Sequence, residues 1–210
     1  MTTLRVPDPA DRNDLGAFIA RVVRLDRSAV VRLRAGDGWI TAWAETPFDV
    51  LVTRTVQGTL EPEDHTVPAS TLLTALAVER SETVDPGPAT PWSGELPPTE
   101  GWTIVDHVPA AELEGLAQRG LNLARQHAGP HGLPASLLDQ TVLTVTATDP
   151  AADTVVKVPL RCLFALSGMG FFDADGQVRV SASGSWLRLD ATYGAVVYRR
   201  VVRLPLLMTS

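Results

Sequence analysis

Hydrophobic positions follow a helical spacing near the start of the chain and then switch to strict alternation. Over residues 11–25, apolar side chains recur every three or four positions, which predicts an amphipathic helix. Its apolar stripe consists of Leu15, Phe18, Ile19, Val22 and Val23. The next stretch alternates with a period of two, with glycine-rich and Thr-Pro turns between the alternating runs. It predicts three strands at about 29–35, 38–45 and 48–56.

The remaining chain predicts further helices and a second set of strands. An acidic loop, EPEDHT, precedes a helix expected from about Pro68, and a longer helix is expected over 108–126. The stretch 135–146 fits a helix by its Ser136 and Asp139 and a strand by its β-branched tail, so both assignments stay open. A third helix is expected over 159–168, and a second strand set begins at about residue 177.

Residues 85–101 interrupt these elements. They contain five prolines and three glycines, so neither a helix nor a central strand can persist there. We therefore predict an N-terminal α+β unit (1–84), a Pro/Gly-rich connector (85–101) and a C-terminal α+β unit (102–210), packed as one body. Trp92 lies within the connector and Trp102 directly follows it, which predicts that the connector lies on the folded protein.

The two strand sets resemble each other. Residues 31–44 (VRLRAGDGWITAWA) align without a gap to residues 178–191 (VRVSASGSWLRLDA), with identity at five of fourteen positions. Each copy follows a mostly apolar helix and continues into a third apolar strand. The expected fold class is α+β, with duplicated helix plus three-stranded antiparallel meander units and helices packed on one sheet or two.

The strands of both copies have one aliphatic face and one face that mixes tryptophan with polar residues. Two interpretations of the mixed face stay open. Either it is an exposed platform for a partner, or helices or the connector cover it, with Arg188 extended along apolar surface. The candidate binding residues are Trp39, Trp43, Trp186, Arg188, Tyr193, Tyr198, Arg199 and Arg200. Pairing of the edge 196–200 between two copies is a further possibility.

Charge argues against a duplex nucleic-acid binder. The net charge is −6, although residues 177–203 hold five arginines against one aspartate. Nucleic-acid binding through the C-terminal hairpin is therefore a minor alternative, and the segment LRCLFALSGM offers a single arginine, Arg161, to a DNA groove. No apolar run reaches the roughly 18 residues that span a bilayer, so no membrane partner is expected. With one cysteine and no secretory signal pattern, we expect a cytoplasmic protein.

Catalytic and cofactor motifs are not visible in the sequence. There is no GxSxG, Walker or GxGxxG pattern, and His127 and His131 straddle a Gly-Pro pair, so neither a metal nor a cofactor is expected. Cys162 lies in an apolar run and is expected to be a buried hydrophobe. An enzyme or small-ligand site between the two units is the main alternative, supported by His65 and Asp106-His107.

The stretches PASLLDQTVLTV, VPLRCLFALSGMGFF and GSWLRLDATYGAVVYRR resemble conserved actinobacterial proteins that carry no known activity. A weaker resemblance is to the EspG-type chaperones of type VII secretion, through the helix-then-meander layout and the phrase LAQRGL at 116–121. That resemblance implies a duplicated α+β protein that binds helical clients. From the residues, we expect a non-catalytic protein that interacts with a protein partner or with itself.

Overall fold

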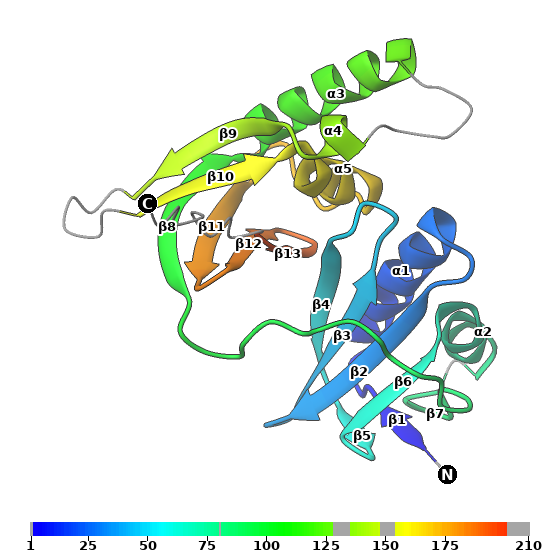
Figure 1. The fold of residues 1–210 in the computed structure, drawn as a ribbon. Helices are drawn as coiled ribbons and strands as arrows, with labels where there is room; N and C mark the ends of the chain where they lie inside the picture. The colour runs from blue at the N-terminus through cyan, green and yellow to red at the C-terminus, as the bar shows by residue number, and fades with distance from the viewer. Residues whose placement is uncertain (1, 80, 128–134, 148–153, 201–210) are drawn as a thin grey trace, which may run out of the picture.

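The computed structural model describes residues 2–79, 81–127, 135–147 and 154–200 (Figure 1). Its helices are α1 (Pro9–Leu25), α2 (Ala69–Glu79), α3 (Ala110–His127), α4 (Ala135–Leu138) and α5 (Leu160–Gly168). The strands of the N-terminal part are β1 (Thr3–Arg5), β2 (Val30–Gly36), β3 (Trp39–Glu45), β4 (Leu51–Gln57), β5 (Thr59–Glu61), β6 (Asp64–Pro68) and β7 (Thr83–Val84). Those of the C-terminal part are β8 (Thr103–Pro109), β9 (Thr141–Thr146), β10 (Val155–Pro159), β11 (Gln177–Ser183), β12 (Trp186–Ala191) and β13 (Gly194–Arg199).

The first helix forms where the apolar spacing predicts it. Asp8 caps the N-terminus of α1, since its carboxylate accepts hydrogen bonds from the backbone N–H groups of Ala10 at 2.6 Å and Asp11 at 3.3 Å. Pro9 occupies the first turn, where its missing N–H costs nothing. The helix then buries the predicted apolar stripe, and Val23 packs partly buried at its edge.

A single eight-stranded antiparallel sheet forms the centre of the molecule, in the order β6-β2-β3-β4-β13-β12-β11-β8. The strand order is symmetrical about its centre: β4 and β13 form the central pair, each half contributes four strands, and β6 and β8 are the edges. The sequence left open whether the meanders form one sheet or two, and the structure joins them in one. The halves meet where Leu51, Val52 and Thr53 pair with Val197, Val196 and Ala195.

The hairpins of the two meanders also share their register. In the first hairpin Arg32 pairs with Trp43 and Gly36 with Trp39. With every residue number raised by 147 (32 + 147 = 179), these pairs become Arg179 with Asp190 and Ser183 with Trp186, which are pairs of the second hairpin. The duplication predicted from the ungapped alignment is therefore present in the backbone.

The described residues also form two smaller sheets, with the orders β5-β1-β7 and β10-β9. Strand β1 leads into α1 and β10 leads into α5, so a strand and a helix directly precede each meander. Each unit also contributes a second helix, α2 or α3, and α2 packs on α1 as α3 packs on α5. The α+β class with duplicated units is confirmed.

One face of the large sheet belongs to the main core. Its aliphatic side chains, among them Leu33, Ile40, Leu187 and Leu189, are fully buried with side chains of the helices. In Figure 1 the helices lie on one side of the sheet, and the connector crosses on the other side. We call the face opposite the helices the outer face.

Some local predictions were wrong. Val108 and Pro109 were expected to begin a helix, but they end strand β8, and α3 starts at Ala110. Of the predicted acidic loop EPEDHT, only Pro62 and Glu63 lie between strands, because Glu61 ends β5 and Asp64 begins β6. The stretch 135–146, for which helix and strand both stayed open, contains both elements: the short helix α4 and then strand β9. The errors at β8 and at β5–β6 arise because pairing with distant strands, rather than local composition, fixes short strands.

Candidate protein-binding groove

Tryptophans of the outer face are partly covered by the connector. Trp43, Leu51, Trp186 and Val197 form a second apolar cluster, separate from the main core. Trp92, Leu96 and Trp102 pack onto this cluster, so the connector lies on the folded protein, as its tryptophans predicted. We call residues 85–102 the strap.

The strap forms internal hydrogen bonds despite its prolines. The indole N–H groups of Trp92 and Trp102 donate to the backbone carbonyls of Gly94 at 2.6 Å and Pro98 at 2.9 Å. These bonds satisfy the polar atom of each half-buried indole while its rings cover the sheet.

Polar contacts and one close approach hold the strap against the sheet. The backbone N–H of Thr90 donates to the carbonyl of Thr66 in β6 at 2.9 Å. Glu95 forms an ion pair with Arg199 of β13. Gly94 lies beside the exposed Glu45 side chain of β3: a Cβ there would lie 2.1 Å from a carboxylate oxygen of Glu45, which would have to swing aside. Glycine at this position leaves room for that carboxylate.

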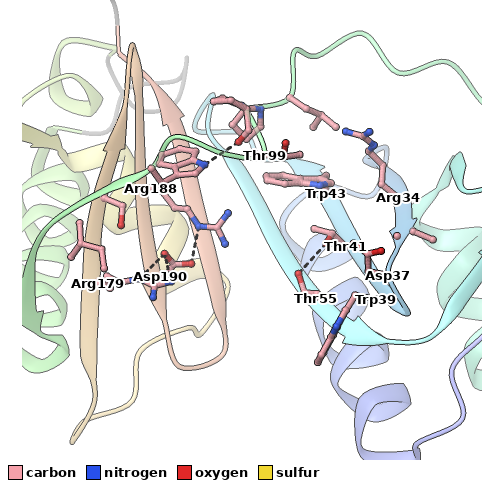
Figure 2. Close-up of a pocket in the computed structure, with 18 residues that line it drawn as sticks. Arg34, Asp37, Trp39, Thr41, Trp43, Thr55, Thr99, Arg179, Arg188 and Asp190 are labelled. Atoms are coloured by element: carbon pink, nitrogen blue, oxygen red, sulfur yellow. Dashed lines mark hydrogen bonds and ion pairs between the residues drawn. The ribbon is translucent and has the colours of Figure 1, made fainter.

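A groove of about 580 Å³ opens beside the strap on the outer face (Figure 2). One wall comes from β2, β3 and β4, the other from β8, β11 and β12, and the strap closes one side. Among the lining residues are Arg34, Asp37, Trp39, Thr41, Trp43, Thr55, Leu96, Pro98, Trp102, Ile104, Arg179, Arg188 and Asp190. Trp39 is 47% exposed and Ile104 53% exposed, so the groove presents apolar surface to solvent.

Arginines flank the groove on both walls. On the first wall, Arg32 donates to both carboxylate oxygens of Asp64, at 2.8 and 2.6 Å, and Arg34 approaches the same group at 3.7 Å. The hydrogen bond from Arg32 holds the pKa of Asp64 below its usual value and raises the pKa of Arg32.

On the second wall, Asp190 accepts hydrogen bonds from two arginines. Arg188 donates through Nε at 2.8 Å, and Arg179 through Nε at 3.4 Å and a terminal nitrogen at 3.2 Å. The Arg188 guanidinium also lies 6.0 Å from the ring centroid of Trp102. Figure 2 shows these side chains on the strands that face the N-terminal wall.

The structure divides the sequence-predicted binding residues among several places. Trp39, Trp43 and Arg188 line the groove. Trp186 and Arg199 lie on the other side of the strap, in a smaller hollow of about 300 Å³, with the Arg199 guanidinium 5.8 Å from the Trp186 ring centroid. Trp43 and Trp186 are buried, so the covered and the exposed interpretation each describe part of this face.

The three remaining candidates lie elsewhere. Tyr193 is exposed in the turn between β12 and β13, and Arg200 donates a hydrogen bond to the carbonyl of Gly184. Tyr198 points to the opposite face, where burial raises the pKa of its hydroxyl, and its ring centroid is 5.6 Å from the guanidinium of Arg161.

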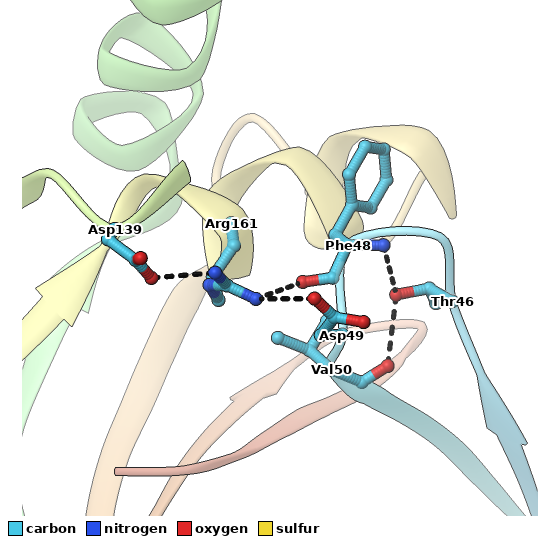
Figure 3. Close-up of polar contacts among 6 residues, drawn as sticks. All are labelled: Thr46, Phe48, Asp49, Val50, Asp139 and Arg161. Carbon is cyan, nitrogen blue, oxygen red and sulfur yellow. Dashed lines mark hydrogen bonds and ion pairs between the residues drawn. The ribbon is translucent and has the colours of Figure 1, made fainter. Parts of the chain in front are cut away.

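Arg161 joins separate parts of the chain (Figure 3). Its guanidinium donates to the Phe48 carbonyl at 2.8 Å, to Asp49 at 3.2 Å and to Asp139 at 2.6 Å. Burial opposes the charged form, but these carboxylates keep the pKa of Arg161 above its usual value. The arginine that was considered for a DNA groove is therefore buried in α5, as the apolar character of that segment predicted.

The residues that supported an enzymatic site do not meet. His65 was expected in the acidic loop EPEDHT, but it is buried in β6 with Nε2 2.9 Å from the Gly87 carbonyl oxygen. His107 follows Asp106 in β8, at the opposite edge of the sheet, and it pairs with Arg179 of β11. The predicted burial of Cys162 is confirmed. Among the described residues, no group of three potential ligands is arranged to hold a metal ion.

Sequence reasoning missed the strap residues that line the groove, namely Leu96, Pro97, Pro98 and Thr99. It also missed Ile104, Arg34, Arg179 and Asp190. The available signal was Trp92 and Trp102, which indicated that the connector packs on the body but not on which face.

The fold is similar to that of bacterial DNA sliding clamps. The DNA polymerase sliding clamp from Pseudomonas aeruginosa superposes with a TM-score of 0.58 at 16% identity, over 98% of this chain and 66% of that chain. The clamp from Bacillus subtilis gives 0.59 at 14% identity, over 97% and 65%. A Caulobacter crescentus beta clamp, with polyethylene glycol at a proposed beta-motif tethering region, gives 0.61 at 15% identity, over 97% and 66%. This chain thus spans about two thirds of their length, and the likeness establishes the fold.

The chain belongs to the family of the domain of unknown function DUF8185, whose model matches residues 97–203, more than half of its length. Residues 1–94 match a second domain of unknown function, DUF8010. A comparison with curated proteins finds no match. Among the described helices, none has the length and apolar character needed to cross a membrane.

Proposed function

We propose that this chain is a non-catalytic protein-binding scaffold, and that the groove beside the strap holds an extended segment of a partner protein. The observation that carries the proposal is the groove itself, where exposed Trp39 and Ile104 lie among arginine and threonine side chains. Tryptophan and arginine are the residues most enriched at the energetic centres of protein interfaces.

The shape of the groove supports an extended segment rather than a small molecule. It is open to solvent along the outer face and lined by side chains from both units and the strap. Small-molecule sites enclose most of their ligand, whereas a peptide laid along a surface needs an open channel with a few anchoring points.

The enzyme alternative has less support. It depended on His65 and Asp106-His107 meeting in a cleft, and these residues lie at opposite edges of the large sheet. Client binding of the EspG type stays a prediction, and it is compatible with a protein-binding groove.

Nucleic-acid binding is a second candidate because the fold is shared with DNA polymerase sliding clamps. The charge of the chain does not favour nucleic-acid binding. The net charge is −6, and the two longest helices, α1 and α3, carry arginines and carboxylates in nearly equal number. Duplex affinity that falls steeply with salt would favour this candidate over the scaffold.

Capture of a partner by matched variants tests the proposal. The chain is immobilised and exposed to native cytosol, alongside Trp39→Ala in the groove and Tyr193→Ala, whose side chain is similarly exposed but outside the groove. We expect a protein retained by the original chain and by Tyr193→Ala, and lost with Trp39→Ala. Equal retention by all three chains would contradict a groove-based interaction.

A further inference from the structure

We infer that the groove selects a partner segment that carries an aspartate or glutamate side chain next to apolar ones. This inference rests on the proposed function and adds the chemistry of the segment. It follows from how the arginines around the groove are paired with carboxylates.

On the first wall two arginines share one carboxylate. Arg32 takes both oxygens of Asp64 in a fork-like pair, at 2.8 and 2.6 Å. Arg34 approaches Asp64 only at 3.7 Å, which is beyond hydrogen-bond distance. The side chain of Arg34 is 47% exposed and belongs to the groove lining. Its planar fork of donors is therefore available to a ligand.

On the second wall, too, two arginines share one carboxylate. Asp190 is the carboxylate of both Arg179 and Arg188, and its own side chain is only 19% exposed. An arginine has five N–H donors, and the three bonds to Asp190 leave most donors of the two guanidiniums unused by that carboxylate. Because Arg188 also lies against Trp102, its guanidinium is held beside an apolar surface.

The charges around the groove therefore leave a cationic excess. Arg34, Arg179 and Arg188 line it, against Asp37 and Asp190. Asp37 belongs to the turn between β2 and β3, where it adopts a left-handed φ of 54°. A carboxylate entering the groove would gain guanidinium donors without displacing an existing ion pair.

The hollow across the strap has the opposite character. Glu45, Asp49 and Glu95 line it, with Arg199 as its cation. An acidic side chain is repelled there and attracted to the groove, so the strap separates two surfaces of opposite charge. The tryptophans and Ile104 favour a peptide carboxylate over duplex DNA, because a duplex presents its phosphate backbone and keeps its base faces stacked away from apolar side chains.

Selection from a phage-displayed library of short random peptides tests the inference on the full chain. We expect the retained peptides to be enriched in Asp or Glu beside aromatic or aliphatic residues. The best peptide, synthesised and labelled with fluorescein, should lose about tenfold or more in affinity with the double variant Arg34→Gln/Arg179→Gln. The control is Arg125→Gln, an exposed arginine on α3, and circular dichroism confirms that each variant is folded.

The outcomes separate the two claims. Peptides that need Trp39 but show no acidic enrichment, or that bind the double arginine variant equally well, overturn the acidic preference and leave the proposed function standing. If no peptide is retained, or if retained peptides bind Trp39→Ala unchanged, the proposed function fails and the inference fails with it. Loss of affinity when Asp or Glu of the peptide is replaced by its amide supports the inference directly.

Discussion

Val52 of β4 and Val196 of β13 are antiparallel partners, and they lie at the join between the two halves of the large sheet. Both side chains are fully buried in the main core. Since the core runs without interruption from one unit to the other through this pair, the two units share one core.

This join predicts that the chain unfolds in one cooperative transition. Val196→Ala should lower the free energy of unfolding by about 2 kcal/mol, through lost burial and the cavity left behind. Val78→Ala, at a position 73% exposed on α2, is the control and should change it little. Urea titrations followed by tryptophan fluorescence and by circular dichroism measure both. Two separated transitions would mean that the units fold independently.

The Arg161 cluster predicts a second effect on stability. Arg161→Met removes the hydrogen bonds to the Phe48 carbonyl and to two carboxylates, with an expected loss of about 1–3 kcal/mol. The loss stays moderate because the side chains of Asp49 and Asp139 are 86% and 59% exposed, so water solvates them once the arginine is gone. Thermal unfolding beside Arg125→Met provides the comparison. An unchanged melting temperature for Arg161→Met would show that this cluster does not hold the units together.

Cys162 is predicted to be unreactive toward thiol reagents in the folded protein. Its side chain is fully buried, and burial raises the pKa of the thiol far above its usual range, so almost no thiolate is present at neutral pH. Ellman's reagent should react slowly with the native chain and rapidly after unfolding in urea. Rapid stoichiometric reaction of the native chain would contradict the packing of α5.

The Arg32–Asp64 pair predicts a pH-dependent contribution to stability. The pKa of Asp64 is lower in the folded than in the unfolded chain, so its contribution is present at neutral pH and disappears as the pH falls below about 4. The size should be under about 1 kcal/mol, because the Asp64 side chain is 44% exposed and solvent screens the pair. Asp64→Asn should therefore be less stable than the original chain near neutral pH, and this difference should shrink on acidification. A difference independent of pH would contradict an ionic origin.

The sequence predicted the repeated features of the fold best. The hairpins around Trp39 and Trp186 are encoded by local alternation and turn residues, and their shared register follows from the alignment. The pairing of β4 with β13 could not be predicted, because the segments are far apart and any apolar strand could have been the neighbour. Strand β8 was missed for a related reason, since its pairing with β11 defines it.

The candidate site was predictable only in part. The alternation placed Trp39, Trp43 and Arg188 on one face, and they line the groove together. The sequence could not show that the strap crosses this face, buries Trp43 and Trp186 and contributes Leu96 and Trp102. A proline-rich segment has no periodicity that reveals which surface it covers.

The measurement that tests the central claim most directly is photo-crosslinking from inside the groove. Benzoylphenylalanine replaces Thr55, an exposed residue of the groove lining, or Tyr193 as the control outside it. After irradiation in native cytosol, mass spectrometry identifies the linked peptides. The account predicts one partner segment attached through position 55 and none through position 193. Equal labelling from both positions, or no protein attached at position 55, would contradict a protein-binding groove.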